Sequence, residues 1–87
     1  MKAKATPKFW KEYERLPRQM QKRARLAYQK WKENPSHPSL HFKRVDEEEA
    51  IYSVRISDDY RALGILRGDT VIWYWIGSHE GYLRLLK

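Results

Sequence analysis

The sequence contains no cysteine among its 87 residues. This absence excludes disulfide bonds, thiolate nucleophiles and cysteine-ligated zinc, and it is compatible with a reducing compartment. Long hydrophobic runs are missing as well: the longest, VIWYWIG, is far shorter than the roughly 20 residues that a membrane-spanning helix needs. No segment resembles a signal peptide, so we expect a cytoplasmic protein with no membrane partner.

Metal-binding motifs are also lacking. The three histidines are His37, His41 and His79, and they form neither an HExxH motif nor a pair at helical spacing, and no carboxylates cluster with them. We therefore expect no metal and no cofactor. Histidine is nevertheless the side chain that changes charge near neutral pH without help. His37 and His79 both flank predicted strand ends, so strand order decides whether they face each other or remain ordinary surface residues.

The composition indicates one small globular domain that spans residues 1–87. Hydrophobic residues make up 41% of the chain and aromatic residues 14%, which is well outside the range of disordered segments. A chain of 87 residues can form one hydrophobic core but not two, and no stretch resembles a linker.

Positive charge is concentrated in the first half of the chain. Residues 1–44 contain 13 lysines and arginines against three acidic residues, whereas residues 45–87 contain five against eight. Such a cationic surface attracts nucleic-acid phosphates, but anionic lipid or an acidic protein would also bind to it, and a well-solvated helix face would have the same composition.

Two helices are predicted in this basic half. Thr6 precedes Pro7 as an N-cap precedes proline at the first helical position, and the apolar spacing that follows indicates a helix over residues 7–16. The second helix should begin at Pro17 or Arg18 and end at Glu33. Its apolar positions recur every three or four residues, and its other face is basic. The apolar face comprises Met20, Ala24, Ala27, Tyr28 and Trp31, and the basic face comprises Lys22, Arg23, Arg25, Lys30 and Lys32.

Four strands are predicted after the prolines of the NPSHPS segment end the second helix. Alternating apolar and polar residues place them at 40–45, 51–56, 60–66 and 70–76, joined by an acidic connection and two short turns. Helices grouped before antiparallel strands define an α+β domain, with two N-terminal helices packed on one face of a four-stranded antiparallel sheet and a short C-terminal tail or helix. By the same alternation, Arg55 shares a face with Ser53, and Arg61 with Leu63.

Several segments together resemble a known family. The runs FWKEYERLP, AYQKWKENPSHPSLHFKRV, YSVRISDDYRALGI and IWYWIGSHEGYLRLL are similar in order and spacing to the RelE/ParE toxin superfamily of bacterial toxin–antitoxin systems. Within that superfamily, the NPSHPSL segment, the VRI and YRAL strands and the closing IGSH resemble the RelE-like mRNA interferases. This resemblance implies a ribosome-dependent endoribonuclease that cuts mRNA by attack of the 2′-hydroxyl group, with a small acidic antitoxin, the ribosome and mRNA as partners.

The resemblance also implies roles for individual residues. His79 and His37 would act as general acid and base, in an order that the sequence leaves open, and Asp59 corresponds to an acidic residue of the family site. Arg55 and Arg61 would stabilise the phosphate charge. The residues expected to bind RNA are Lys43, Arg44, Lys22, Arg23 and Tyr82. An arginine beside an acidic turn also forms ion pairs, so a structural role for Arg61 is the alternative.

Two other functions fit the same pattern. ParE-like relatives share the scaffold but bind DNA gyrase, and a non-catalytic RNA- or ribosome-binding module would need only the basic helix. The presence of both His37 and His79 favours the nuclease.

Overall fold

The computed structural model describes residues 1–85, and the last two residues of the expected C-terminal tail lie outside this range. The helices and strands follow one another as β1 (Lys2–Ala5), α1 (Pro7–Glu14), α2 (Arg18–Glu33), the 3₁₀ helix η1 (Pro38–Leu40), β2 (Lys43–Arg44), β3 (Ile51–Ser57), β4 (Tyr60–Arg67), β5 (Thr70–Ser78) and α3 (His79–Leu85). Within these 85 residues, no helix combines the length and hydropathy that crossing a membrane requires.

The sheet is mixed and has five strands in the order β1-β5-β4-β3-β2. The α+β class is confirmed, but the expected count of four antiparallel strands is wrong because Lys2–Ala5 pairs in parallel with β5. Lys2 lies opposite Thr70, almost at the other end of the sequence. A four-residue strand of alternating lysine and alanine has little local signal, and only its long-range partner makes it a strand.

The expected strand at 40–45 is mostly wrong. Only Lys43–Arg44 pairs with β3, whereas Leu40 ends η1 and His41 adopts a left-handed backbone conformation with φ of 45°. This turn breaks the extended chain and directs both Leu40 and Phe42 into the core. Leu40 and Phe42 therefore alternate with polar residues because the turn at His41 points both of them inward, and not because the segment is a strand.

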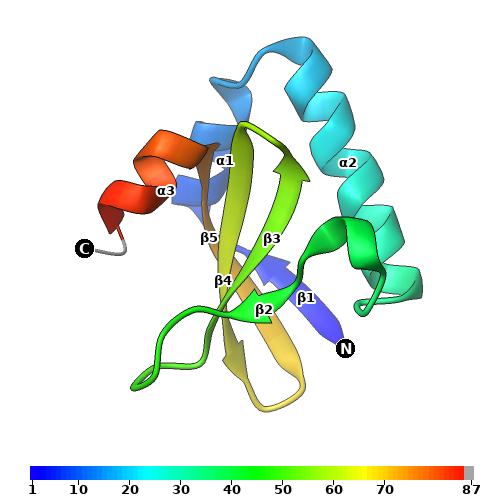
Figure 1. Cartoon of the computed structure of the whole chain (residues 1–87), viewed down its shortest axis with the longest axis vertical. Coiled ribbons are helices and arrows are strands. Elements are labelled where there is room, and N and C mark those ends of the chain that lie inside the picture. The colour runs from blue at the N-terminus through cyan, green and yellow to red at the C-terminus, as the bar shows by residue number, and fades with distance from the viewer. Residues whose placement is uncertain (86–87) are drawn as a thin grey trace.

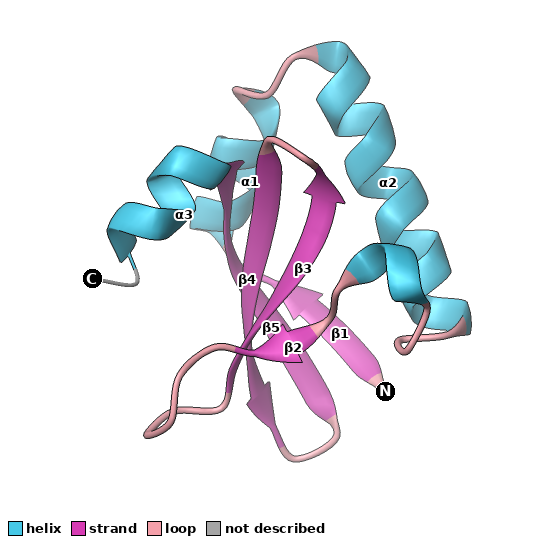
Figure 2. Ribbon diagram, viewed as in Figure 1, coloured by secondary structure: helices cyan, strands magenta, loops and turns pink. Residues whose placement is uncertain are grey.

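The helices cover both faces of the sheet, as Figures 1 and 2 show, with α2 on one side of the strands and α3 on the other. One core contains residues of α1, α2 and the sheet face beneath them, which confirms that the N-terminal helix pair covers one face. The second core, on the opposite face, comprises Leu63, Trp75 and Tyr82 of α3. On this second face, α3 packs against β4 and β5.

The N-terminal helices begin where the sequence predicts. The Thr6 hydroxyl oxygen accepts a hydrogen bond from the Phe9 amide at 3.1 Å and so caps α1. Helix α2 is attached to the sheet by Trp31, which is 1% exposed and packs edge-to-face on Trp73 with ring centroids 5.5 Å apart. Gly64 accommodates this arrangement, because a Cβ atom there would lie 2.7 Å from the Trp73 ring.

Candidate active site

Two arginines stand opposite each other on the sheet face that α1 and α2 leave free. Arg55 of β3 is the cross-strand partner of Arg61 of β4, and Arg61 in turn faces Gly77 of β5. Directly opposed like charges destabilise a sheet unless other groups compensate for them. Packing alone would therefore not favour this arginine pair. The groups that offset the repulsion between the two guanidinium groups also hold them in place.

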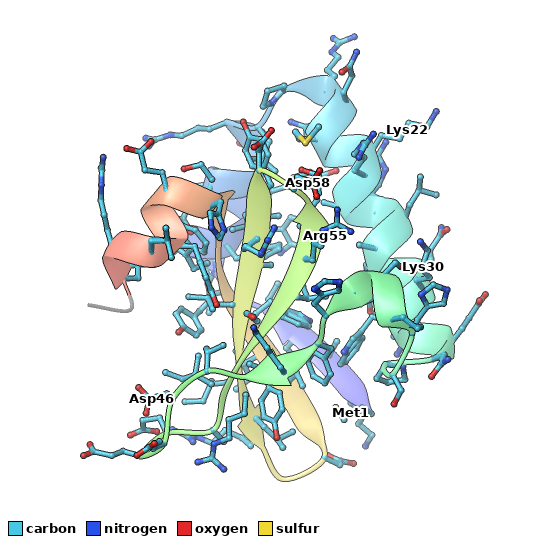
Figure 3. The ribbon with its side chains drawn as sticks, in the orientation of Figure 1. Met1, Lys22, Lys30, Asp46, Arg55 and Asp58 are labelled. Carbon is cyan, nitrogen blue, oxygen red and sulfur yellow. The ribbon has the colours of Figure 1, made fainter. Side chains whose placement is uncertain are left out.

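The compensation comes from the tight turn between β3 and β4. Arg55 forms an ion pair with Asp58, and Figure 3 shows the two residues together at the end of β3, at the edge of the sheet nearer to α2. Arg61 instead donates from Nη1 to the backbone carbonyl oxygens of Ser57 and Tyr60, the latter at 3.0 Å. The acidic turn thus forms its ion pair with Arg55 rather than with Arg61, and both guanidinium groups are held by partners in the turn.

The lowered pKa of Asp58 indicates a positive electrostatic potential at this end of the sheet. Its pKa is held below the usual value, first by the hydrogen bond and charge of Arg55 and then by the charges of Arg61 and Arg23. Since Asp58 is exposed, an anion in solution can approach the same arginines. The geometry favours binding of a negatively charged group beside the β3–β4 turn.

His79 lies at the same end of the sheet. Its backbone N–H donates to the Asp59 carbonyl oxygen at 2.6 Å, which ties the start of α3 to the β3–β4 turn. The imidazole stacks on the Tyr82 ring with centroids 5.7 Å apart and planes at 26°. Its Nδ1 atom is buried and has no hydrogen-bond partner among the described residues. A histidine, an aspartate and two arginines therefore border one part of the free face.

The sequence of this domain matches a family model. The model describes the ParE-like toxin domain and matches residues 18–84, which is most of the chain. The chain belongs to the ParE-like toxin domain family. No curated protein sequence matches it.

Solved toxin structures share the fold. The RelB–RelE antitoxin–toxin complex from Methanococcus jannaschii superimposes with a TM-score of 0.77 at 19% identity, covering 97% of this chain and 99% of that one. The YoeB/ParE toxin from Agrobacterium tumefaciens gives 0.71 at 20% identity, covering 91% and 99%. YafQ from E. coli gives 0.74 at 8% identity, covering 92% and 94%. The membership in the RelE/ParE superfamily that the sequence predicted is confirmed.

The toxin domain does not bring its two candidate catalytic histidines together. His79 follows β5, whereas His37 precedes η1, which packs on α2 and β3. Strand β4 lies between β3 and β5, so two strand spacings, or about 10 Å, separate the strand beside η1 from the strand that leads to His79. His37 Nδ1 accepts a hydrogen bond from the Ser39 amide at 3.2 Å and so caps η1. The expectation that the two imidazoles face each other is not met.

This arrangement predicts that His37 acts as a cap and not in proton transfer. We expect His37→Asn to retain toxin activity within about threefold of wild type, because asparagine is also a good N-cap, whereas His37→Ala should lower the free energy of unfolding by about 1 kcal/mol. Urea denaturation and growth inhibition on induction measure the two effects. Loss of activity in a stably folded His37→Asn variant would restore His37 to the catalytic site.

The other expected RNA-binding residues have different surroundings. Tyr82 is 7% exposed and packs in the second core, so its ring contacts the His79 ring and is not exposed for stacking on an RNA base. The Arg44 guanidinium donates to the carbonyl oxygens of Asp46 and Glu47 at 2.8 and 3.1 Å and shapes the acidic loop. Lys43 is exposed opposite Ser53, on the same face as the arginine pair.

The basic residues of α2 divide into two groups. Lys22 points away from the sheet, as Figure 3 shows, whereas Arg23 lines a groove between α2 and β3. The sequence reasoning missed Lys30 and Ser39, which line the same groove. Helical spacing relates Arg23 to Lys30, but only the packing of α2 indicates that this side of the helix faces β3. Among residues 1–85, no three His, Asp or Glu side chains group so as to hold a metal ion.

Proposed function

We propose that this toxin domain is an endoribonuclease that cleaves mRNA on the ribosome. The observation that carries the proposal is the opposed pair Arg55 and Arg61, held beside His79 on the free face of the sheet. Fixed guanidinium groups stabilise the charge that grows on a phosphate during cleavage. The resemblance of the IGSH, VRI and YRAL segments to RelE-like interferases supports the same reaction.

In the proposed reaction, the ribose 2′-oxygen attacks the adjacent phosphorus and the bond from phosphorus to the 5′-oxygen breaks. The products are a 2′,3′-cyclic phosphate and a free 5′-hydroxyl group. One group must remove the 2′-hydroxyl proton and another must protonate the departing 5′-oxygen. We assign these two transfers to His79 and the exposed Asp59 carboxylate, because a backbone hydrogen bond holds the main chains of these two residues side by side.

We further propose that an acidic antitoxin silences this activity. The first half of the chain has a formal charge of about +10, which favours an acidic partner by charge complementarity. The structural neighbours include toxins solved in complex with antitoxins, such as DinJ–YafQ from E. coli and RelE–RelB from Pyrococcus horikoshii. A neighbouring reading frame for a small acidic protein would support this pairing.

A translating extract tests the nuclease. We expect the wild-type domain to stop translation, and primer extension to map new RNA ends within translated codons. The same mRNA without a start codon should stay intact, because cleavage depends on the ribosome. The competing ParE-like function predicts no cuts and instead inhibition of DNA supercoiling by gyrase. Supercoiling inhibition without RNA cleavage would overturn the proposal.

A further inference from the structure

A groove runs between α2 and the outer edge of β3. Strand β2 pairs only with Tyr52 and Ser53, so within residues 1–85 the part of β3 from Val54 to Ser57 has no strand on that side. Helix α2 and η1 form the other walls, and the space between them measures about 360 Å³. Leu40 and Ile56 line it with apolar surface.

Three cations from two elements line this groove. Arg23 and Lys30 are seven residues apart on α2 and so project from the same side of the helix, and Arg55 approaches from β3. All the residues that line the groove within the described chain are basic, apolar or serine. The nearby Asp58 is ion-paired with Arg55, and the charge of Arg23 contributes to lowering its pKa. The groove is therefore strongly cationic, and the carboxylate that contacts one of its arginines is Asp58.

A hydroxyl group fixes one of these cations in place. Ser39 Oγ accepts a hydrogen bond from Lys30 Nζ at 3.3 Å, and it lies 2.8 Å from His37 Nδ1, which accepts its proton. Guanidinium and ammonium groups donate hydrogen bonds to phosphate oxygens, which only accept them. Figure 3 labels Lys30 on α2 and Arg55 on β3, which belong to opposite walls of the groove.

We infer that this groove binds a backbone phosphate of the RNA strand, adjacent to the scissile phosphate. The inference rests on the proposed function in taking Arg61 and His79 as the point of cleavage. Arg55 connects the two places: it is one strand spacing, about 4.8 Å, from Arg61 and it also lines the groove. A strand that crosses β4 and β3 would place one phosphate at the arginine pair and the next toward Arg23 and Lys30.

Paired charge variants of α2 test the inference. The double variant Arg23→Ala/Lys30→Ala removes two groove cations, and Arg18→Ala/Lys32→Ala removes two exposed cations of the same helix that do not line the groove. The probe is a fluorescently labelled single-stranded oligoribonucleotide with 2′-deoxyribose at every position where cleavage could occur. Fluorescence anisotropy at several salt concentrations gives the dissociation constants, and thermal denaturation confirms that both variants are folded.

We expect the groove variant to bind at least about tenfold more weakly than the control variant. In a plot of log affinity against log salt concentration, the slope for the groove variant should be smaller in magnitude than that for the control variant by about 0.7, the value for one single-strand phosphate contact. Equal weakening in the two variants, or no binding of the probe by the wild type, would overturn the inference. A groove variant that loses affinity only for an acidic peptide would assign the groove to a protein partner instead.

This test is independent of cleavage. If the extract shows no RNA cuts but the groove variant binds the probe poorly, the nuclease proposal fails and the phosphate site stands. If cuts appear and the two double variants bind alike, the nuclease stands and the phosphate site fails.

Discussion

Replacing His79 with alanine is expected to lower mRNA cleavage by about 10²- to 10⁴-fold, the usual contribution of a positioned acid or base. The reason is that His79 is the histidine anchored to the β3–β4 turn, where the two arginines are held. The measurement is primer extension in the translating extract, with the rate of appearance of new RNA ends compared at equal protein concentration.

Two further variants separate chemistry from structure in this experiment. The His79 ring stacks on the Tyr82 ring, so the alanine variant also loses this packing within α3. His79→Gln keeps most of the side-chain volume but has no titratable group. His41→Asn serves as the matched control, because His41 is exposed and asparagine accepts its left-handed backbone conformation. Normal cleavage by a folded His79→Gln variant would reject His79 as a proton carrier.

Replacing Trp31 with alanine is expected to lower the free energy of unfolding by about 3–5 kcal/mol. Trp31 is almost completely buried and packs on both Trp73 and Phe42, so its removal leaves a cavity between α2 and the sheet. Small domains are stable by only about 5–15 kcal/mol, so this loss is a large fraction of the total. For a domain of this size it corresponds to a fall in Tm of very roughly 12–40 °C.

Thermal and urea denaturation measure this loss, and Trp10→Ala is its control. Trp10 is 51% exposed on α1, so the same substitution there should change stability by no more than about 1 kcal/mol. Because α2 forms one wall of the groove, we also expect the Trp31 variant to lose RNA binding as it unfolds. A Trp31→Ala variant as stable as Trp10→Ala would contradict this account of how α2 is held.

Local patterns in the sequence were sufficient for most of the regular structure. The apolar spacing of residues 18–33 predicted α2, and alternation predicted β3, β4 and β5 almost to their ends. Alternation also placed Arg55 with Ser53 and Arg61 with Leu63, and the observed strand pairs agree. These features depend on neighbours within a few positions, which a single sequence displays directly.

The elements that the sequence did not reveal depend on distant partners. Strand β1 exists because Lys2 meets Thr70, and the segment after η1 turns at His41 so that Leu40 and Phe42 reach the core. Neither arrangement follows from the residues nearby, because the free energy that stabilises it comes from contacts with other elements.

For the candidate site, the sequence by itself determined which groups are available: two strand arginines, an acidic turn and a histidine after the last strand. Tertiary structure decided which of them meet. Strand order placed His79 near the β3–β4 turn and left His37 on the far side of β3, where it caps η1. The packing of the elements also paired Asp58 with Arg55 and buried Tyr82. It placed Arg23 and Lys30 of α2 toward β3. The reason is that the surroundings of a side chain depend on how whole helices and strands pack.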